Sequence, residues 1–329
     1  MGPRRTLWEE VAEIATSRGG MEQRAQALLT PLRSVVPYSA AWIAVRDPET
    51  RLHRPVAQDG ATTPLARYFA LPEADDELEA LSLNRFQPPV RATDLPVPLD
   101  ETRAWGEYLL PAGFRDGLAM PLFSDDGRHL GFISLLTDRP GHRTTTFSGL
   151  VEQLRPLLAL ALDRLPSLAM AALATEDAIG AAVLSRGGRS LPLPGMPLHP
   201  LLASGTLVVA LARKYASDAG SPGSFLSPWA GGFARITVVD CREEGIDHLA
   251  TLALVSPAHD AAGMSLPDLQ ALSGLVAGWD AEQIRARCGV AQVQARMRSV
   301  AHSMGFASTD ALLTHAAAEG LYLPPALWP

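Results

Sequence analysis

The residues best suited to chemistry are four arginines near the C-terminus. Arg285, Arg287, Arg296 and Arg298 lie within residues 284–303, a stretch that contains no aspartate or glutamate. A guanidinium group donates hydrogen bonds in a planar fork that fits phosphate oxygens. The local charge of +4 therefore suits contact with a nucleic-acid backbone. Arginines on short helices are also common as solvated surface, and that interpretation stays open here.

Two short helices must position these arginines. Asp280 can cap the first helix, and Gln283, three residues later, completes a capping-box pattern. The second helix begins near Gln292 and ends at Gly305, after a turn at residues 289–290. Its apolar residues share one helical stripe, at Val293, Met297, Val300 and Met304. This arrangement predicts a helix–turn–helix whose second helix enters the major groove of DNA.

The polar side of this helix pair supplies the candidate contacts with DNA. The predicted DNA-binding residues are Arg285, Arg287, Gln292, Gln294, Arg296, Arg298 and His302. Those on the second helix are expected to reach bases or phosphates. Arg285 and Arg287, on the first helix, are expected to reach only the DNA backbone.

A second candidate site is formed by aromatic residues in the N-terminal part of the chain. Aromatic side chains between a sheet and crossing helices can enclose a small organic ligand. The predicted ligand-binding residues are Trp42, Tyr68, Phe69, Phe86, Trp105, Tyr108 and Phe114, with Arg54 and Arg115 as counter-charges for an anionic ligand. The same aromatics fit equally a hydrophobic core, and the two arginines fit surface ion pairs.

Patterns typical of catalysis or metal binding are missing from the sequence. The eight histidines form no metal-ligand spacing, and the two cysteines, Cys241 and Cys288, lie far apart and are expected to be reduced core residues. No glycine-rich phosphate loop or nucleophile elbow is found. The acid pair Asp75–Asp76 is interpreted as a solvated helix start. We therefore expect no cofactor, metal site or catalytic residue.

The composition describes a folded protein. Of the 329 residues, 47% are hydrophobic and 19% charged, which excludes a disordered or fibrous chain and allows two or three domains. The net charge of −7 argues against a protein that coats nucleic acid over its whole surface. The most apolar run, residues 157–173, is interrupted by Asp163, Arg164 and Pro166, so we expect no membrane span and a cytoplasmic location.

Residues 1–166 are expected to form an α+β domain. Two hairpins are predicted at residues 40–57 and 117–136, the second around an Asp-Gly turn. Helices are predicted at residues 7–32, 65–70, 75–83, around Trp105 and at 148–165. The run GLAMPL from Gly117, the run GFISLLTD from Gly131 and the pair Phe147-Ser148 resemble a GAF domain. This resemblance implies a sensor fold that binds a small molecule.

Residues 167–260 repeat this pattern in outline. A hairpin at 181–193, a helix at 198–215 and strands at Phe225, 233–241 and 249–256 are expected. Five strands with one helix resemble a PAS-like α+β module. A purely structural bridge fits the same pattern, and no motif distinguishes the two.

Residues 261–329 resemble the all-α DNA-binding domain of LuxR-type bacterial transcription regulators. The matching positions are Asp268, Leu269, Gly278, Ile284, Gly289, Val290, Met304, Gly305, Phe306 and Ser308. The whole chain is similar to actinobacterial regulators that place a GAF domain before such a terminus, including the trailing run GLYLPP from Gly320.

The second helix departs from the family pattern at its start. Only Ala291 and Gln292 separate Val290 from Val293, where family members usually carry four residues, typically a serine cap and then a Lys-Thr pair. Loss of the cap costs about 1 kcal/mol of helix stability. The missing pair also lies where the helix touches phosphates.

These features lead to one hypothesis and one alternative. The hypothesis is a cytoplasmic, homodimeric transcription regulator whose GAF-like domain senses a small molecule or a partner protein and whose C-terminal helices bind DNA. The alternative is a repurposed family member that has lost DNA binding. Its terminal helices would serve dimerisation or packing, and the chain would act as a ligand-binding accessory protein or an enzyme through its aromatic pocket.

Overall fold

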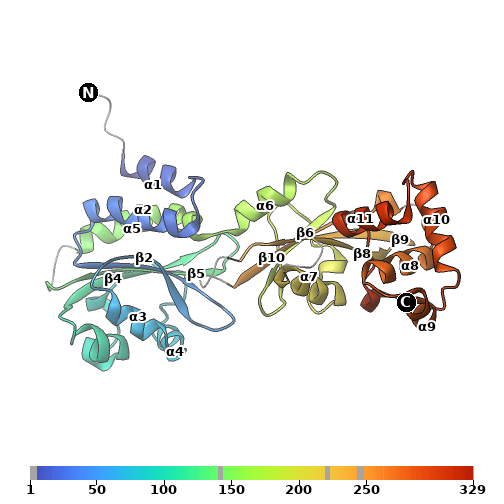
Figure 1. Cartoon of the computed structure of the whole chain (residues 1–329). Helices are drawn as coiled ribbons and strands as arrows, with labels where there is room; N and C mark the ends of the chain where they lie inside the picture. Colours follow the sequence, from blue (N-terminus) through green and yellow to red (C-terminus); the bar gives the residue numbers. More distant parts are fainter. Residues whose placement is uncertain (1–5, 140–143, 219–222, 243–247, 262, 329) are drawn as a thin grey trace. The chain divides into compact units, whose positions relative to one another are not determined.

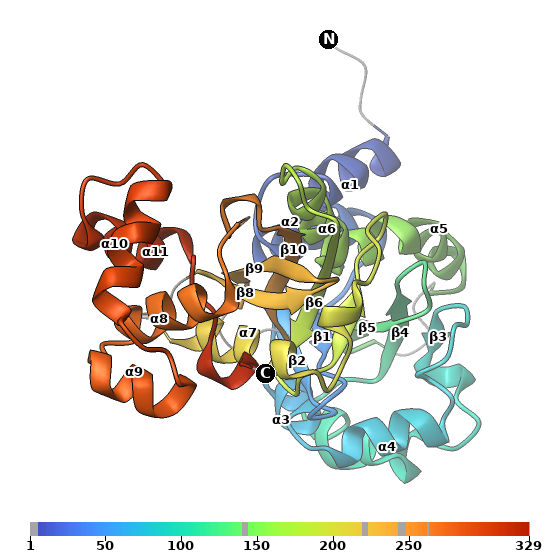
Figure 2. The same ribbon diagram turned by 90° about the vertical axis from the view of Figure 1, so that its right-hand side faces the viewer.

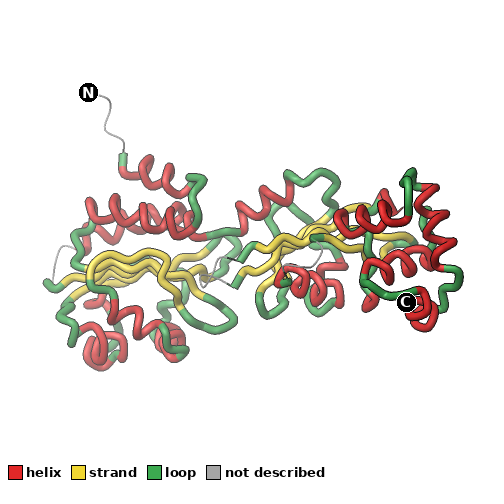
Figure 3. The backbone as a smooth tube through the Cα atoms, in the orientation of Figure 1, coloured by secondary structure: helices red, strands yellow, loops and turns green. Residues whose placement is uncertain are grey.

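The computed structural model describes residues 6–139, 144–218, 223–242, 248–261 and 263–328. Two units of the chain are distinguished, Met1–Arg164 with Glu243–His248, and Leu165–Arg242 with Leu249–Pro329. Each unit contains a five-stranded sheet whose neighbouring strands are all antiparallel, and helices pack on these sheets (Figures 1 and 3). The α+β class predicted from the sequence is confirmed.

The sheet of the first unit has the strand order β2-β1-β5-β4-β3. Its strands are β1 (Ala40–Arg46), β2 (His53–Gly60), β3 (Val90–Arg91), β4 (Asp116–Phe123) and β5 (His129–Thr137). Both predicted hairpins are present, as β1–β2 and β4–β5. In the β1–β2 turn the Asp47 carboxylate accepts hydrogen bonds from the backbone N–H groups of Glu49 (2.9 Å) and Thr50 (3.3 Å), an arrangement that aspartate favours in turns.

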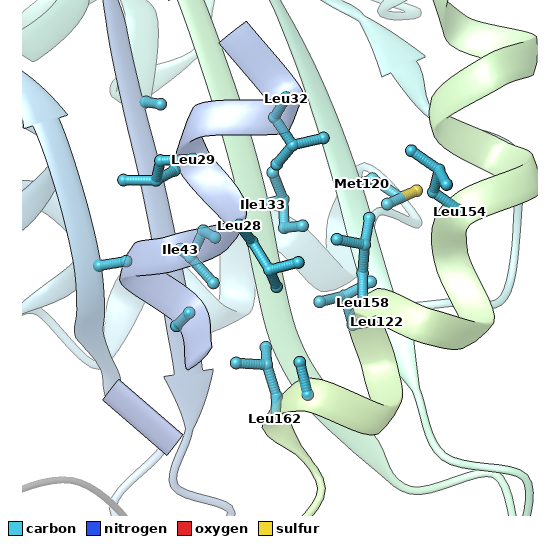
Figure 4. Close-up of a cluster of buried hydrophobic side chains, with 14 of the residues drawn as sticks. Leu28, Leu29, Leu32, Ile43, Met120, Leu122, Ile133, Leu154, Leu158 and Leu162 are labelled. Carbon is cyan, nitrogen blue, oxygen red and sulfur yellow. The ribbon is translucent and has the colours of Figure 1, made fainter. Parts of the chain in front are cut away.

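Helices cover both faces of this sheet. On one face lie α1 (Leu7–Ala15), α2 (Met21–Val35) and α5 (Thr144–Leu162); on the other lie α3 (Thr63–Phe69), α4 (Glu73–Ala80) and the π-helix η3 (Ala104–Leu109) (Figure 1). Two short 3₁₀ helices, η1 (Ala92–Asp94) and η2 (Leu99–Glu101), lie between β3 and η3 in the chain. Figure 4 shows the core between α2, α5 and the sheet, where Leu28, Leu32, Ile133, Leu154 and Leu158 meet.

The single helix predicted over residues 7–32 is two helices. The N–H of Thr16 donates back to Ala12 O at the end of α1, and Gly19 and Gly20 follow before α2 begins. Helix α1 therefore ends at Ala15, before the two glycines, and the extended backbone of Gly20 forms the N-cap of α2.

The sheet of the second unit has the order β7-β6-β10-β9-β8. Its strands are β6 (Gly180–Ser185), β7 (Ser190–Pro192), β8 (Ser224–Trp229), β9 (Gly232–Asp240) and β10 (Leu249–Pro257). Helix α6 (Leu165–Leu173) precedes the sheet. The helix predicted at 198–215 is a 3₁₀ turn, η4 (Pro200–Leu202), and then α7 (Leu207–Ser217). The break falls at Gly205, whose φ is +84°, and Thr206 caps the new helix.

The last part of the chain contains four α-helices (Figure 2). Their apolar side chains belong to one hydrophobic cluster. The helices are α8 (Leu266–Val276), α9 (Ala281–Cys288), α10 (Val293–Ser303) and α11 (Thr309–Glu319), with short 3₁₀ turns at η5 (His259–Ala261) and η6 (Pro325–Leu327). Their cluster includes Leu226 of the edge strand β8, whose N–H donates to Tyr322 O at 2.7 Å. These helices therefore share their core with the second sheet, and their separation as a domain at 261–329 stays a prediction.

Candidate functional site

An apolar cavity lies between the first sheet and helices α3, α4 and η3. Its volume is about 80 Å³. The helices contribute large side chains such as Phe69 and Trp105, whereas the sheet contributes the small Ala119 and Ser134 beside Leu136. The cavity exists because the two short side chains leave room above the strands.

Gly117 also lies on the sheet side of the cavity. A Cβ atom at Gly117 would lie 2.9 Å from Leu136 Cδ2 and 3.4 Å from the Trp105 ring. The first distance is shorter than carbon atoms tolerate, so the glycine lets Trp105 and Leu136 pack closely over the strand. The GLAMPL run of β4 therefore has a structural reason to begin with glycine.

The polar side chains of Tyr68, Glu77 and Thr102 in the cavity wall already have partners. The Tyr68 hydroxyl donates to the Glu77 carboxylate, which also accepts backbone N–H groups from Arg103 (2.5 Å) and Ala104 (3.1 Å). Burial, together with this hydrogen bond to Glu77, raises the pKa of Tyr68 and keeps it neutral. The Thr102 hydroxyl donates to Leu99 O at 2.9 Å. These polar groups are satisfied, so the wall favours a neutral, apolar occupant.

Arg91 lies at the margin of the cavity, but its charge is directed to the other face of the sheet. It stands opposite Leu118 in the β3–β4 ladder, and Leu118 packs in the core beneath α2 and α5. Residues directly opposite on antiparallel strands share a face. The guanidinium Nη2 lies 4.0 Å from the buried carboxylate of Asp116 on that side. Arg91 still contributes to the cavity lining, and its Nε is buried without a hydrogen-bond partner.

Three of the residues predicted to bind a ligand line this cavity: Tyr68, Phe69 and Trp105. Trp42, fully buried, stacks on Phe69 with ring centroids 4.6 Å apart, and so supports the wall from behind. Tyr108 lies beside Tyr68 at 5.7 Å, and Phe114 is buried in the same core.

The other three predicted ligand-binding residues lie elsewhere. Arg54 stands opposite Val45, on the sheet face covered by α2. Arg115 is exposed and donates to the backbone oxygens of Leu110 and Phe114. Phe86 is 73% exposed and lines a separate surface hollow. Neither arginine can serve as a counter-charge for a ligand in the cavity.

Asp75 anchors a charge network that the sequence interpretation missed. We interpreted Asp75–Asp76 as a solvated pair, yet Asp75 is only 2% exposed. Arg46 donates to both of its oxygens (2.8 and 2.6 Å), Arg51 Nε lies 3.0 Å away and His53 Nε2 lies 3.3 Å away. Burial alone would raise the pKa of Asp75, but the hydrogen bonds from Arg46, His53 and Arg51 outweigh it and lower the pKa.

The two histidines beside this network stay neutral. Burial lowers the pKa of both histidines, that of His129 to about 3, and the charge of Arg46 lowers each further. One signal for the network was present in the sequence, since Arg46, Arg51 and His53 all flank one hairpin turn. Asp76, by contrast, is largely exposed, as expected.

The terminal helices form a second candidate site, at the junction of α9 and α10. A surface hollow of about 600 Å³ brings together Arg285, Gln292, Gln294 and Arg298, four of the predicted DNA-binding residues. All four are exposed. Glu282 also lines this hollow, and its carboxylate lies 4.0 Å from Arg285. Of the two arginines in the hollow, Arg298 is the one without an ion pair among the described residues.

The remaining predicted DNA-binding residues lie outside that hollow. Arg296 donates to the Asp268 carboxylate of α8 at 2.7 Å, so a carboxylate already neutralises its charge. The guanidinium of Arg287 lies over the Trp279 ring, 4.2 Å from its centroid. His302 is exposed in the last turn of α10.

Helix α10 begins without a side-chain cap. Its N-cap residue, Gln292, has φ 55° and ψ 39°, in the left-handed region, and its side chain accepts no hydrogen bond from the helix. A residue with a Cβ atom is strained there by about 1–2 kcal/mol. Helix α9, by contrast, has the predicted Asp280–Gln283 capping box and ends at Gly289 with φ +70°. The absence of a serine cap on α10 is thus visible in the structure.

Within the described part of the chain, no group of three or more His, Cys, Asp or Glu side chains is placed to hold a metal ion. Nor does any single described helix have the length and apolar character of a membrane span, although Ser148–Leu162 and Leu165–Leu173 meet that test when they are joined across their bend.

Comparisons with known proteins give weak likenesses. No family model matches the chain, and no curated protein matches it. The chain is similar to a GAF domain from A. aeolicus NLH2 (TM-score 0.33, 15% identity, covering 47% of this chain and 92% of that one). It is also similar to the phycocyanobilin-bound GAF domain of a cyanobacterial phytochrome (TM-score 0.36, 17% identity, covering 47% of this chain and 92% of that one). A bacteriophytochrome from R. palustris is similar too (TM-score 0.36, 13% identity, covering 75% of this chain and 60% of that one). Likenesses at this level assign no function to the chain.

Proposed function

We propose that this protein is a regulator in which a GAF-like first unit senses a small, neutral, apolar molecule and the terminal helices contact DNA. The apolar cavity carries the first part of the proposal. Small residues on the sheet side leave room for it, and Tyr68, Glu77 and Thr102 in its wall are hydrogen-bonded within the protein. An apolar cavity between a sheet and crossing helices is a candidate site for a small molecule.

The arrangement of α9 and α10 supports the second part. Two short helices are joined by a left-handed glycine, α10 buries one apolar stripe, and Arg298, Gln292 and Gln294 stay exposed. An exposed guanidinium and two amides on the second helix of such a pair suit the edges and phosphates of a DNA groove. We expect Arg296 to contribute less to DNA binding, because its guanidinium already donates a hydrogen bond to the Asp268 carboxylate.

A homodimer completes the mechanism that we propose. Two copies would place two α10 helices at a fixed spacing on DNA, and occupancy of the cavity would change that spacing. The ligand acts at a distance, so it must favour one of two arrangements of the dimer.

Two observations favour a second candidate function, in which the terminal helices are a packing module without DNA contact. Helix α10 starts from a strained, uncapped Gln292, and α8–α11 share their core with strand β8. In that case the cavity would serve a ligand-binding accessory protein.

Retention of genomic DNA distinguishes the two candidates. The purified full-length protein is mixed with fragments of its own genome over a range of salt concentrations, and the retained fragments are sequenced. Sequence-selective retention that weakens steeply with salt is the result expected of the regulator. If a folded protein retains no fragments at any salt concentration, α10 does not bind DNA and the packing module is the correct account.

A further inference from the structure

A surface hollow on the α5 side of the first unit is separate from the apolar cavity. Its volume is about 780 Å³, within the range of small-molecule sites. Its lining includes Arg85, Phe86, Phe123, Asp125, Glu152 and Arg155, none of which lines the cavity. The residues come from the segment after α4, the β4–β5 turn and the middle of α5.

Arg155 is the buried charge of this hollow. It is 5% exposed, and its Nη2 donates to Gln87 O at 2.6 Å. Its Nε is buried and has no hydrogen-bond partner. A buried donor left unsatisfied is costly, more so on a charged group. Burial lowers the pKa of Arg155, which reflects the same unfavourable surroundings of its charge. An acceptor brought by a ligand would relieve this cost.

Phe86 covers the guanidinium of Arg155 from the solvent side. The guanidinium carbon lies 4.6 Å from the centre of the Phe86 ring, which is 73% exposed. Phe123 stands beside it, with ring centroids 6.1 Å apart and the planes inclined at 60°. A ring so exposed is held on one side only, so it can turn away from Nε at little cost and offer a flat face to a planar molecule.

The other charges of the hollow limit what can bind. Glu152 Oε1 lies 3.8 Å from Arg155 Nη2 and is 44% exposed, and Asp125 is exposed on the β4–β5 turn. Arg85 adds one exposed positive charge. Water screens the exposed groups, whereas Arg155 cannot turn into solvent. Two carboxylates at the margin oppose a ligand with several negative charges, so a single negative charge fits best.

We propose that this hollow binds a small aromatic monocarboxylate, with the carboxylate on Arg155 and the aromatic ring between Phe86 and Phe123. Phe86 turns aside as the carboxylate reaches Nε, and its ring then packs on the ligand. This site is independent of the proposed sensing cavity, which favours a neutral occupant.

Isothermal titration of the full-length protein tests this site with phenylacetate and indole-3-acetate, each compared with its neutral amide. The carboxylates are expected to bind at least about 10-fold more tightly than the amides, because hydrogen bonds to a charged group are the stronger ones. Arg155→Gln should weaken carboxylate binding about 10- to 100-fold. Arg155→Lys, which keeps the charge but loses the planar fork, should fall between.

Phe86→Ala gives a test that does not depend on the stability of the buried site. Because this side chain is largely exposed, the variant should fold normally and weaken binding of both carboxylates about 3- to 10-fold. Arg33→Gln is the matched control, since Arg33 also lies over an aromatic ring, that of Tyr38 at 4.7 Å, but lines none of the hollows described above. It should bind like the wild type.

Three results would overturn the proposal. The first is a folded wild type that binds neither carboxylate. The second is equal affinity for carboxylate and amide. The third is retained affinity in Phe86→Ala and Arg155→Gln together with loss in Ala119→Leu, which fills the apolar cavity and would place the ligand there.

Discussion

The two sheets of this protein have the same strand order but carry different side chains on the faces that α3 and α7 cover. Numbered within each unit, both run 2-1-5-4-3 with antiparallel neighbours. On the first sheet the face beneath α3 and η3 carries Gly117, Ala119 and Ser134, and a cavity remains above them. On the second sheet the face beneath α7 carries the branched Ile236 and Val255 beside three alanines, Ala182, Ala234 and Ala253, in a packed core.

This difference shows how one topology can serve two purposes. The strand order fixes where helices can cross the sheet, and the size of the side chains on the covered face determines whether a space remains beneath them. We therefore favour the interpretation of the second sheet as a structural bridge, since its edge strand β8 also joins the core of α8–α11. The first sheet is the better candidate for sensing.

The largest effect is expected at the charge network around Asp75 in the first unit. Asp75→Asn leaves Arg46, Arg51 and His53 without their carboxylate, and breaking a buried ion pair costs about 3–5 kcal/mol. Urea denaturation measures the loss in free energy of unfolding. Asp76→Asn is the control, because Asp76 is 63% exposed and should change stability by less than about 0.5 kcal/mol.

The same network predicts a dependence on pH. The pKa of Asp75 is lower in the folded state than in the unfolded chain, where it is about 4. Its stabilising contribution is therefore fully present above pH 4 and is lost as the pH falls below that value. The difference in stability between the wild type and Asp75→Asn should shrink in that acidic range. A constant difference from pH 7 to pH 3 would contradict this account.

A larger side chain at position 119 should abolish the cavity above the first sheet. Ala119→Leu adds three carbon atoms to a space of about 80 Å³, so xenon, which enters dry apolar cavities, should no longer bind. Xenon NMR measures this directly. Ala119→Ser keeps the size of the side chain and should bind xenon like the wild type. Equal binding by the leucine variant would show that the cavity is not the xenon site.

At the terminal helices we expect unequal effects from two neighbouring arginines. Arg298→Ala should reduce the slope of log affinity for DNA against log salt by about 1, as expected for loss of one phosphate contact. Arg296→Ala should reduce it less, because Asp268 already neutralises Arg296. Fluorescence anisotropy with a retained DNA fragment measures both slopes. A larger change for Arg296 would contradict the assignment.

The smallest effect is expected at the start of α10. Gln292→Gly removes the strain of a left-handed residue and should stabilise the protein by about 1 kcal/mol. Gln294→Gly, within the helix, should instead destabilise it by roughly 0.5–1 kcal/mol. Thermal unfolding distinguishes the two signs. Destabilisation by Gln292→Gly would mean that the left-handed start is not strained.

The sequence predicted the strands well because their signals are local. Alternating side chains and turn residues define both hairpins of the first unit within a few residues. The capping box of α9 and the apolar stripe of α10 were predicted for the same reason. The break between α1 and α2 was missed, because the apolar periodicity continues across Gly19 and Gly20.

The site was predicted less completely, because its contacts join distant parts of the chain. Arg296 and Asp268 are 28 residues apart, and Arg46 and Asp75 are 29 apart. No local sequence pattern predicts an ion pair between residues so far apart in the chain. Aromatic residues could be recognised as candidates, but only the folded sheet separates Tyr68 and Trp105, which line the cavity, from the exposed Phe86.

Sensing and DNA binding must be coupled if this protein is a regulator. The most direct test compares the dissociation constant of the wild type and of Ala119→Leu for a retained DNA fragment at one salt concentration. Since the leucine occupies the cavity as a ligand would, we predict a change of about 5-fold or more, with the salt slope unchanged. An identical dissociation constant in a folded Ala119→Leu protein would contradict the claim that the cavity controls the terminal helices.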